Sequence, residues 1–411
     1  MRRRMWATAA ALVISTPLVA CTEAGEEPIQ FWNPLTGDDG QFMRQIVEEY
    51  NATEPEVPVE FMPAPEADMY PRIYSVARTG DDVPDLVLIH GPRVAELARS
   101  EVLEPIDHLT DLQPELSEEN YLPSAWESAE LDGQTWGIPL DLHGIITFYN
   151  EDLLAEYDAE RFLDDEIVTV DELLSLEGRL PEGIYAMPGL FMPAMVQGWQ
   201  YNLGGGFTNS SGDVDLTGQR WADAYEALVN LQEAGLIAPE DSDPMQVFNS
   251  GHALFFPDGT WGVSGHEAID GLNFGTANAI QYQAENPINL LESHLFVQMN
   301  DPERTDERDR AVADFVEYVR THSMKWAEAG QIVASREAYE SEEYRQFAQS
   351  YFTEPEQEEL LMTDNYEYGP YVMGGLWDYT NDIVYGRMSI DRGLAQMNNE
   401  VNARIQMAEM S

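Results

Sequence analysis

The side chains in this sequence best suited to chemistry are four tryptophans, each beside Gly, Asn or Asp near the end of an expected element. They are Trp32, Trp199, Trp261 and Trp377. An indole has a flat apolar face and one polar N–H edge, so it can lie against a sugar ring. A tryptophan considered alone is more readily explained as part of a core. The four positions therefore indicate a sugar site only where other features support one.

Motifs for catalysis and for metal binding are weak. Glycosidases use a pair of carboxylates for catalysis, but in a chain with 75 acidic residues neighbouring acids such as Asp38-Asp39 arise by chance. The sequence has no G-x-S-x-G motif, and "GGGF" at 204–207 lacks the spacing of a phosphate-binding loop. "NSSGDVDLTG" from Asn209 lacks the glycine and closing glutamate of an EF-hand, and the seven histidines form no H-x-x-x-H pair. We expect no enzyme, no cofactor and no metal, and a structural calcium ion stays open.

The N-terminal segment is typical of an exported lipoprotein. Three arginines precede an apolar stretch at 5–20, which is shorter than the roughly 20 residues of a membrane span. "LVAC", which ends at Cys21, resembles the bacterial lipobox, and this implies cleavage before Cys21 and its acylation. We expect residues 1–20 to be a signal peptide and residues 21–28 a lipidated tether, because two or three acyl chains anchor a protein durably. Arg3-Arg4 leaves twin-arginine export open.

The charge balance excludes one class of partner. The chain has 21 basic and 75 acidic residues and a formal net charge of −54, whereas nucleic-acid binding depends on basic charge. Lys325 is the only lysine. Dense carboxylates with almost no lysine favour a halophilic protein, which folds in concentrated salt that screens self-repulsion. An ordinary acidic exported protein is the alternative.

Hydrophobic periodicity predicts an α/β organisation. The expected elements are strands at 29–32, 57–61 and 85–90 and helices at 41–50 and 66–79. Their alternation favours a mainly parallel sheet with helices on both faces. A second such unit begins near 138–149, and the best amphipathic helix is expected at 219–234, followed by Gly235 as a stop signal. Periodicity does not assign a later strand from His294 or a helix at 311–320 to either unit.

Five blocks of sequence follow one another between residue 29 and the C-terminal helices. They are "FWNPLTGDDGQFMRQIVEEYNATEPEVPVEF", "PDLVLIHGPRVAELARSEVLEPID", "DGQTWGIPLDLHGIITFYNEDLL", "FNSGHALFFPDGTWGV" and "WAEAGQIVAS". Together they resemble extracellular solute-binding proteins of the maltose-binding type, which serve carbohydrate ABC importers. The resemblance implies a type II periplasmic-binding-protein fold, with two α/β lobes, each a mainly parallel sheet flanked by helices, joined by crossing hinge strands. It places residues 29–139 and 295–322 in lobe 1 and residues 140–294 and 323–411 in lobe 2.

The resemblance also implies roles for single residues. Trp261 in "PDGTWG" and Trp377 in "GLWDYTNDIV" match ring-stacking tryptophans, and Asp38 matches a first-loop position that bonds sugar hydroxyls. His143 stands where maltose-binding relatives have a carboxylate, which argues against assuming maltose. The predicted ligand-binding set is Trp32, Asp38, Asp141, His143, Trp199, Asp258, Trp261 and Trp377.

The acids of this set have plainer explanations as well. Charge-assisted hydrogen bonds from sugar hydroxyls to Asp38, Asp141 and Asp258 would hold a ring that indole faces cover. Asp38 is equally suited to cap the next helix, and Asp258 to a surface turn. Asp141 and His143 share one side of a strand, and that side can face solvent.

These features predict the substrate-binding lipoprotein of an ABC importer. It would capture a neutral sugar or oligosaccharide in the cleft between the lobes, and closure would present the ligand to membrane permease subunits. We expect a monomer outside the cytoplasm, attached to the cell membrane through Cys21. Two alternatives stay open: a polyamine or other cation as ligand, and a ligand-sensing lipoprotein that partners a membrane receptor.

Overall fold

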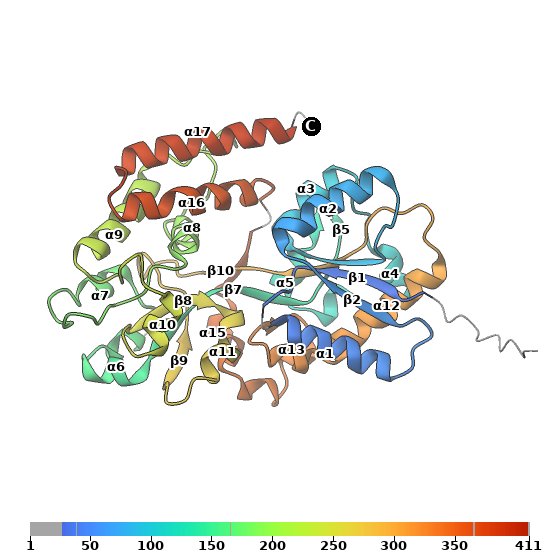
Figure 1. The fold of residues 1–411 in the computed structure, drawn as a ribbon, viewed down its shortest axis with the longest axis horizontal. Helices are drawn as coiled ribbons and strands as arrows, with labels where there is room; N and C mark the ends of the chain where they lie inside the picture. The colour runs from blue at the N-terminus through green and yellow to red at the C-terminus, as the bar shows by residue number, and fades with distance from the viewer. Residues whose placement is uncertain (1–26, 38, 165, 365, 410–411) are drawn as a thin grey trace, which may run out of the picture.

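The computed structural model describes residues 27–409 except positions 38, 165 and 365. Its strands form two main sheets in two halves of the molecule, and a few strands run between the halves through the middle (Figure 1). The predicted two-lobed α/β fold is confirmed. Within the described residues, no helix combines the length and the apolar character needed to cross a bilayer.

The first sheet has the strand order β2-β1-β3-β11-β6. Its strands are β1 (Ile29–Asn33), β2 (Val59–Pro63), β3 (Leu86–His90), β6 (Ile138–Pro139) and β11 (His294–Val297). β1 pairs in parallel with β2 and β3, as the alternation of strands and helices predicts, and β11 is antiparallel to β3 and β6. The helices of this half are α1 (Asp39–Ala52), α2 (Glu66–Thr79), α3 (Val94–Arg99), α4 (Asp107–Leu112), α5 (Pro123–Glu127) and α12 (Asp306–Thr321).

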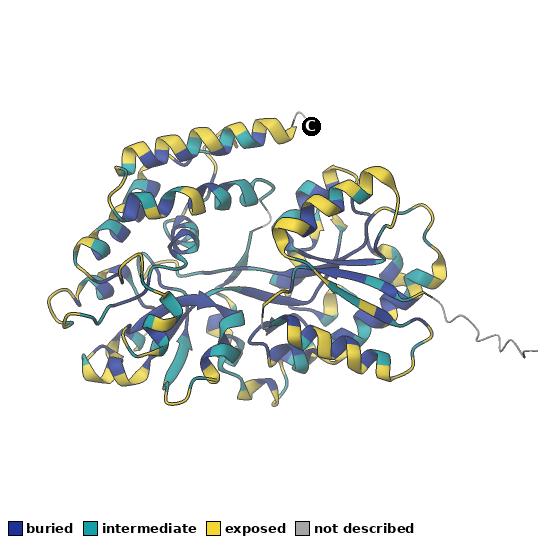
Figure 2. Cartoon of the chain, viewed as in Figure 1, coloured by how far each residue is buried: buried dark blue, intermediate teal, exposed yellow. Residues whose placement is uncertain are grey.

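Alternating side chains of β1 and β3 build a core on each face of the first sheet. Phe31 and Leu88 pack in the core that includes residues of α1 and α12. Trp32 and Ile89 pack in the core that includes residues of α2 and α3. Successive strand residues point to opposite faces, so a strand covered on both sides needs a continuous apolar run such as the one that forms β3. Figure 2 shows these strands buried beneath helices with exposed outer faces.

The second sheet is built around one long strand, β7 (Asp141–Asn150). Its other strands are β8 (Phe255–Gly259), β9 (Phe274–Ala277), β10 (Asn289–Glu292), β12 (Ile332–Val333) and β13 (Leu361–Thr363). β7 is antiparallel to β8, β9, β10 and β12, while β10 and β13 pair in parallel. These directions differ from the mainly parallel sheet that we expected. The strands beside β7 come from distant parts of the chain, so they do not form consecutive β-α-β units.

The second half of the molecule ends in two long helices. Its helices are α6 (Glu151–Glu156), α7 (Val170–Leu174), α8 (Met192–Asn202), α9 (Gln219–Glu233), α10 (Pro244–Asn249), α11 (Val263–Glu267), α14 (Arg336–Tyr339), α15 (Pro355–Glu358), α16 (Gly369–Val384) and α17 (Ile390–Glu409). Helix α13 (Ser323–Ala327) lies at the boundary, where it packs against α1 of the first half and β12 of the second. α9 confirms the predicted amphipathic helix, and Gly235 beyond it has a φ of 70°. α16 can approach α17 closely because Gly375 has no Cβ; a Cβ there would lie only 2.5 Å from Cγ2 of Val401.

Two short crossings join the sheets. The chain passes from β6 to β7 through Leu140, and from β10 back to β11 through Ser293. The backbone N–H of Leu140 donates to the carbonyl of His294 at 2.8 Å. The backbone N–H of His294 donates to Oδ1 of Asp141 at 3.0 Å. The two crossings are therefore bonded to each other at the boundary between the sheets.

Candidate functional site

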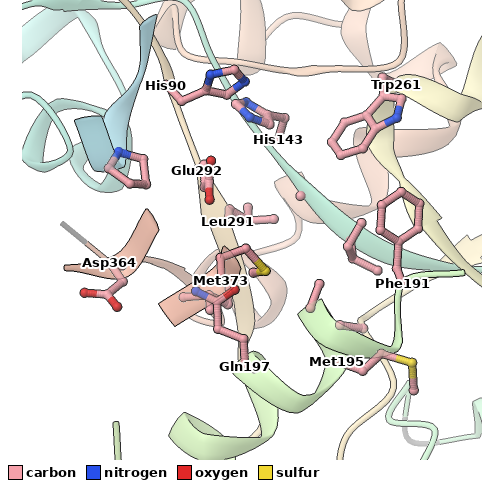
Figure 3. A pocket seen from close by; sticks show the side chains of 18 of the residues that line it. His90, His143, Phe191, Met195, Gln197, Trp261, Leu291, Glu292, Asp364 and Met373 are labelled. Atoms are coloured by element: carbon pink, nitrogen blue, oxygen red, sulfur yellow. The ribbon is translucent and has the colours of Figure 1, made fainter. Parts of the chain in front are cut away.

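A cavity of about 640 Å³ lies where the two sheets meet. The first half contributes Asp39, Glu66 and Arg93 from helices and His90 from the end of β3, among others. The second half contributes Phe191, Trp199, Trp261, Ile280, Asp364, Met373 and Trp377, among others. Figure 3 shows the labelled side chains converging from separate elements on one open space. Because both halves line it, a ligand held here contacts both lobes.

The crossing strands form one side of this cavity. His143 on β7 pairs in register with Glu292 on β10, and His294 begins β11. All three residues line the cavity. Gly144 permits this crowding, since a Cβ there would lie 2.6 Å from Cδ2 of Leu291 and 2.9 Å from a backbone carbonyl oxygen. The two strands therefore approach each other directly beside the cavity.

Asp141 lies behind the histidines and is fully buried. Its Oδ1 accepts from Nδ1 of His143 at 3.0 Å and from the backbone N–H of His294 at 3.0 Å. Its Oδ2 accepts from Nδ1 of His294 at 2.9 Å and from Nε1 of Trp326 at 2.8 Å. Burial alone would raise the pKa of Asp141, but His294 and His143 more than offset burial, so its pKa lies below the ordinary value. The ionised carboxylate fixes both imidazoles.

Aromatic rings form the apolar wall of the cavity. Phe191 packs edge-on against Trp261, with ring centroids 6.1 Å apart, and against Trp377 at 5.9 Å. Trp261 also lies 6.0 Å from the ring of His143. Trp377 is 48% exposed, which is unusual for a large apolar side chain. A half-exposed indole on a concave surface indicates a contact site for a ligand.

Acidic side chains face this aromatic wall. Burial raises the pKa of Asp39, of Glu292 and of Asp364 above the ordinary values. The hydroxyl of Tyr201 donates to Asp364. Arg93 donates to Glu66 at 3.1 Å, which balances one of the acids. The cavity therefore has one polar side, on which the carboxyl groups are hydrogen-bonded, paired with Arg93, or less readily ionised than in water.

The structure brings together half of the predicted binding residues. His143, Trp199, Trp261 and Trp377 line the cavity. Trp199 is buried and its Nε1 donates to the carbonyl of Ile280 at 2.7 Å, so its polar edge is already used.

The other predicted residues lie elsewhere. Asp141 supports His143 from behind, and Asp258 is buried beside Nε2 of His266 at 3.2 Å. Trp32 packs in the core of the first half, where the guanidinium of Arg72 lies 3.7 Å from its ring centroid. Asp38 and Cys21 are outside the described residues.

Sequence reasoning missed several residues of the cavity. His90 and His294 end and begin strands that pair with each other, yet they are far apart in the chain. Phe191 and Glu292 were not predicted either, because no local sequence motif identifies them as binding residues. The available signal was indirect: His90 is the last residue of a strand that is otherwise apolar, and ligands often bind at such strand ends in α/β proteins.

Comparisons with known proteins agree with this architecture. Residues 45–364 match the model of the family described as bacterial extracellular solute-binding protein. A maltotriose-binding protein of Pyrococcus abyssi is 26% identical over 137 residues, which is 33% of this chain and 28% of that relative's length.

Solved structures show the same fold. The GacH receptor of Streptomyces glaucescens, solved unliganded and with acarbose, superposes with a TM-score of 0.75 at 18% identity, over 91% of this chain and 97% of the receptor. UgpB of Mycobacterium tuberculosis, in complex with glycerophosphocholine, gives 0.75 at 17% identity, over 93% of this chain and 99% of UgpB. The sugar-binding protein MalE of Xanthomonas citri gives 0.76 at 16% identity, over 93% and 99%.

Proposed function

Because the chain belongs to the bacterial extracellular solute-binding proteins, we propose that it is the substrate-binding lipoprotein of an ABC importer and that its ligand is a neutral sugar or oligosaccharide. The observation that supports this best is the cavity itself, in which an aromatic wall faces polar groups from both halves. Its volume of about 640 Å³ lies within the roughly 300–1,000 Å³ of small-molecule sites.

The two walls suit the two kinds of surface on a sugar. The exposed indole of Trp377 and the ring of Trp261 would cover the apolar C–H side of a ring. His143 and Glu292 would hydrogen-bond the hydroxyl groups from the crossing strands, and Asp38 would add an acceptor from the first loop. Asp141 would act through the histidine that it orients rather than by contact.

Closure would couple binding to transport. Contacts with residues of both halves exist only when the halves approach, so a ligand stabilises the closed form by its differential affinity. We assign residues 29–139 and 295–322 to one lobe and residues 140–294 and 323–411 to the other. Cys21 would anchor the monomeric protein to the outer side of the cell membrane, where permease subunits receive the ligand.

A cationic ligand is the second candidate, because four carboxyl groups line the cavity: Asp39, Glu66, Glu292 and Asp364. Three of them have pKa values raised by burial, so their charged forms are disfavoured. Glu66 is paired with Arg93. Ionised, unpaired acids bind a cation best, so the direction of these pKa shifts and the Glu66–Arg93 pair weigh against a cationic ligand.

Thermal unfolding of the full chain in molar salt tests the proposal. A ligand at 100 times its dissociation constant stabilises the native state by about 2.7 kcal/mol. We expect one class of mono- or oligosaccharide to raise the unfolding midpoint and polyamines to leave it unchanged. Trp377→Ala should abolish the shift, whereas Met407→Ala, which truncates an exposed apolar side chain on α17, should preserve it. A shift with polyamines alone would overturn the proposal.

A further inference from the structure

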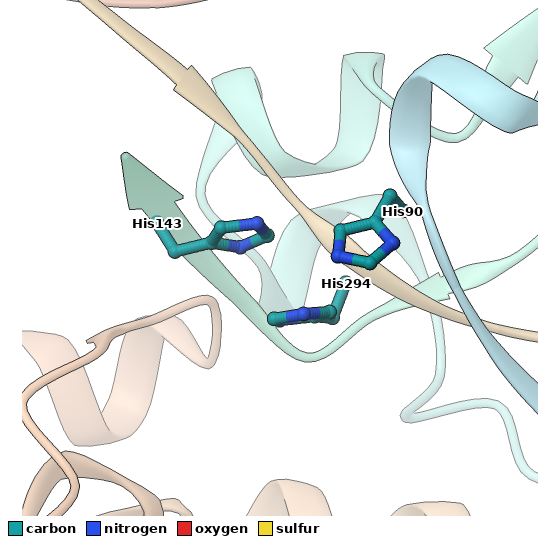
Figure 4. Close-up of side chains that lie close together, drawn as sticks. All are labelled: His90, His143 and His294. Carbon is teal, nitrogen blue, oxygen red and sulfur yellow. The ribbon is translucent and has the colours of Figure 1, made fainter. Parts of the chain in front are cut away.

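Three imidazoles from three different strands meet beside the cavity. They are His90 at the end of β3, His143 on β7 and His294 at the start of β11. One ring nitrogen of each lies within 4.8 Å of the others. The rings of His143 and His294 are stacked with centroids 3.9 Å apart, and the ring of His90 lies 5.0 Å from that of His294 (Figure 4).

The same nitrogen of each ring is already occupied. Nδ1 of His143 and Nδ1 of His294 both donate to the carboxylate of Asp141. Nδ1 of His90 lies 3.0 Å from the hydroxyl of Tyr70. No hydrogen bond among the described residues uses Nε2 of these three histidines. An imidazole whose Nδ1–H is held by a carboxylate presents the lone pair of Nε2, which is the atom that binds a metal.

From this geometry we propose that His90, His143 and His294 bind one divalent transition-metal ion of the zinc type through Nε2. Imidazole nitrogen suits zinc, copper and nickel, whereas calcium and magnesium prefer oxygen ligands. Hydrogen bonds from the opposite ring nitrogen to a carboxylate are the arrangement that orients histidine ligands around zinc. Three protein ligands leave a fourth coordination position for a water molecule or a ligand atom in the cavity, so in the metal-bound protein a sugar hydroxyl would meet the ion in place of Nε2 of His143.

The strands that supply the ligands explain what the metal does to the protein. His90 and His294 belong to the first sheet, and His143 belongs to the second. At zinc–nitrogen distances of about 2.0–2.1 Å, tetrahedral ligands lie roughly 3.3 Å apart. Because a nitrogen lone pair lies in its ring plane, the stacked rings of His143 and His294 must turn, as well as approach His90, for the three Nε2 atoms to face one ion. The bound ion would then fasten the two halves to each other at their boundary.

A zinc titration of the metal-free full chain tests this inference. It contains no sugar, so its result does not depend on the proposed function. We expect one zinc ion per chain by calorimetry and by metal analysis after gel filtration. A hundredfold excess of calcium should not displace the zinc, because surface carboxylates bind calcium but imidazoles do not. Absence of stoichiometric zinc binding, or displacement of zinc by calcium, would overturn the inference.

Variants separate the three histidines from the other histidines and acids of the chain. His90→Gln and His143→Gln should each lose stoichiometric zinc binding. Tyr70→Phe removes only the hydroxyl beside His90 and should weaken binding by about 10-fold. His252→Gln changes an exposed histidine bonded to Ser250 and should bind zinc as the unaltered chain does. Equal loss in His252→Gln, or retained binding in both His90→Gln and His143→Gln, would refute the assignment.

Discussion

Replacing Asp141 with asparagine should destabilise the fold far more than the loss of one exposed acid. The carboxylate is fully buried and accepts hydrogen bonds from Nδ1 of His143, from Nδ1 and the backbone N–H of His294, and from Nε1 of Trp326. Asparagine has one acceptor oxygen, and its amide nitrogen must take the place of the other. Either orientation of the amide sets an N–H group against one imidazole, which can change tautomer and accept, and against one group that can only donate, either the backbone N–H of His294 or Nε1 of Trp326.

The magnitude follows from the bonds that are lost. A hydrogen bond to a charged group contributes about 1.5–3 kcal/mol; Asp141→Asn removes one such bond outright and replaces the charged acceptor of the others with a neutral amide. Breaking a buried charged pair costs about 3–5 kcal/mol because the remaining partners stay buried without it. We therefore expect the free energy of unfolding to fall by about 3–5 kcal/mol for Asp141→Asn.

Urea denaturation of the full chain, followed by tryptophan fluorescence and by circular dichroism, measures this change. Asp258→Asn is the matched control. Asp258 is also buried, but its two partners are Nε2 of His266 and the backbone N–H of Gly259. An amide offers one donor and one acceptor to those partners, so the expected loss is about 1 kcal/mol. Equal losses in the two variants, or a loss below 1 kcal/mol for Asp141→Asn, would refute the reasoning.

Three further predictions concern the cavity. The pKa of Asp364 is raised by folding, so its contribution to stability is complete below its pKa in the unfolded chain and is lost as pH rises through its pKa in the folded chain. Melting curves from pH 4 to 7 should therefore show Asp364→Asn gaining stability relative to the unaltered chain as pH rises. Gly144→Ala should cost about 1–3 kcal/mol in urea denaturation, because its Cβ would meet Leu291. Trp377→Ala should change the free energy of unfolding by less than about 0.5 kcal/mol, since the indole is half exposed, while reducing sugar affinity measured by calorimetry.

Local pattern was enough to predict most elements. The helix expected at 66–79 is α2 with the same bounds, and Pro71 lies inside it. The apolar run at 85–90 is β3, because a strand buried on both faces is apolar throughout. Strand directions in the second sheet were not predictable, since the partners of β7 come from segments that only tertiary packing brings together.

The site was predicted in part for the same reason. A period of two placed Asp141 and His143 on one side of a strand, and they are bonded at 3.0 Å. Periodicity gives no sign that this side faces inward, because the residues that cover it, His294 and Trp326, lie far along the chain. Trp32 illustrates the converse: its neighbours in sequence suggested a loop edge, whereas β1 buries it beneath α2.

The position of Asp141 links the hinge to the cavity. One carboxylate holds β7, the start of β11 and α13 through His143, His294 and Trp326. Two of these partners also line the cavity. A ligand that engages their free Nε2 atoms therefore acts on the same hydrogen bonds that fix the crossing segments. Since a ligand shifts a conformational equilibrium only by its differential affinity for the two states, a contact made at the crossing is more sensitive to closure than a contact on either outer wall.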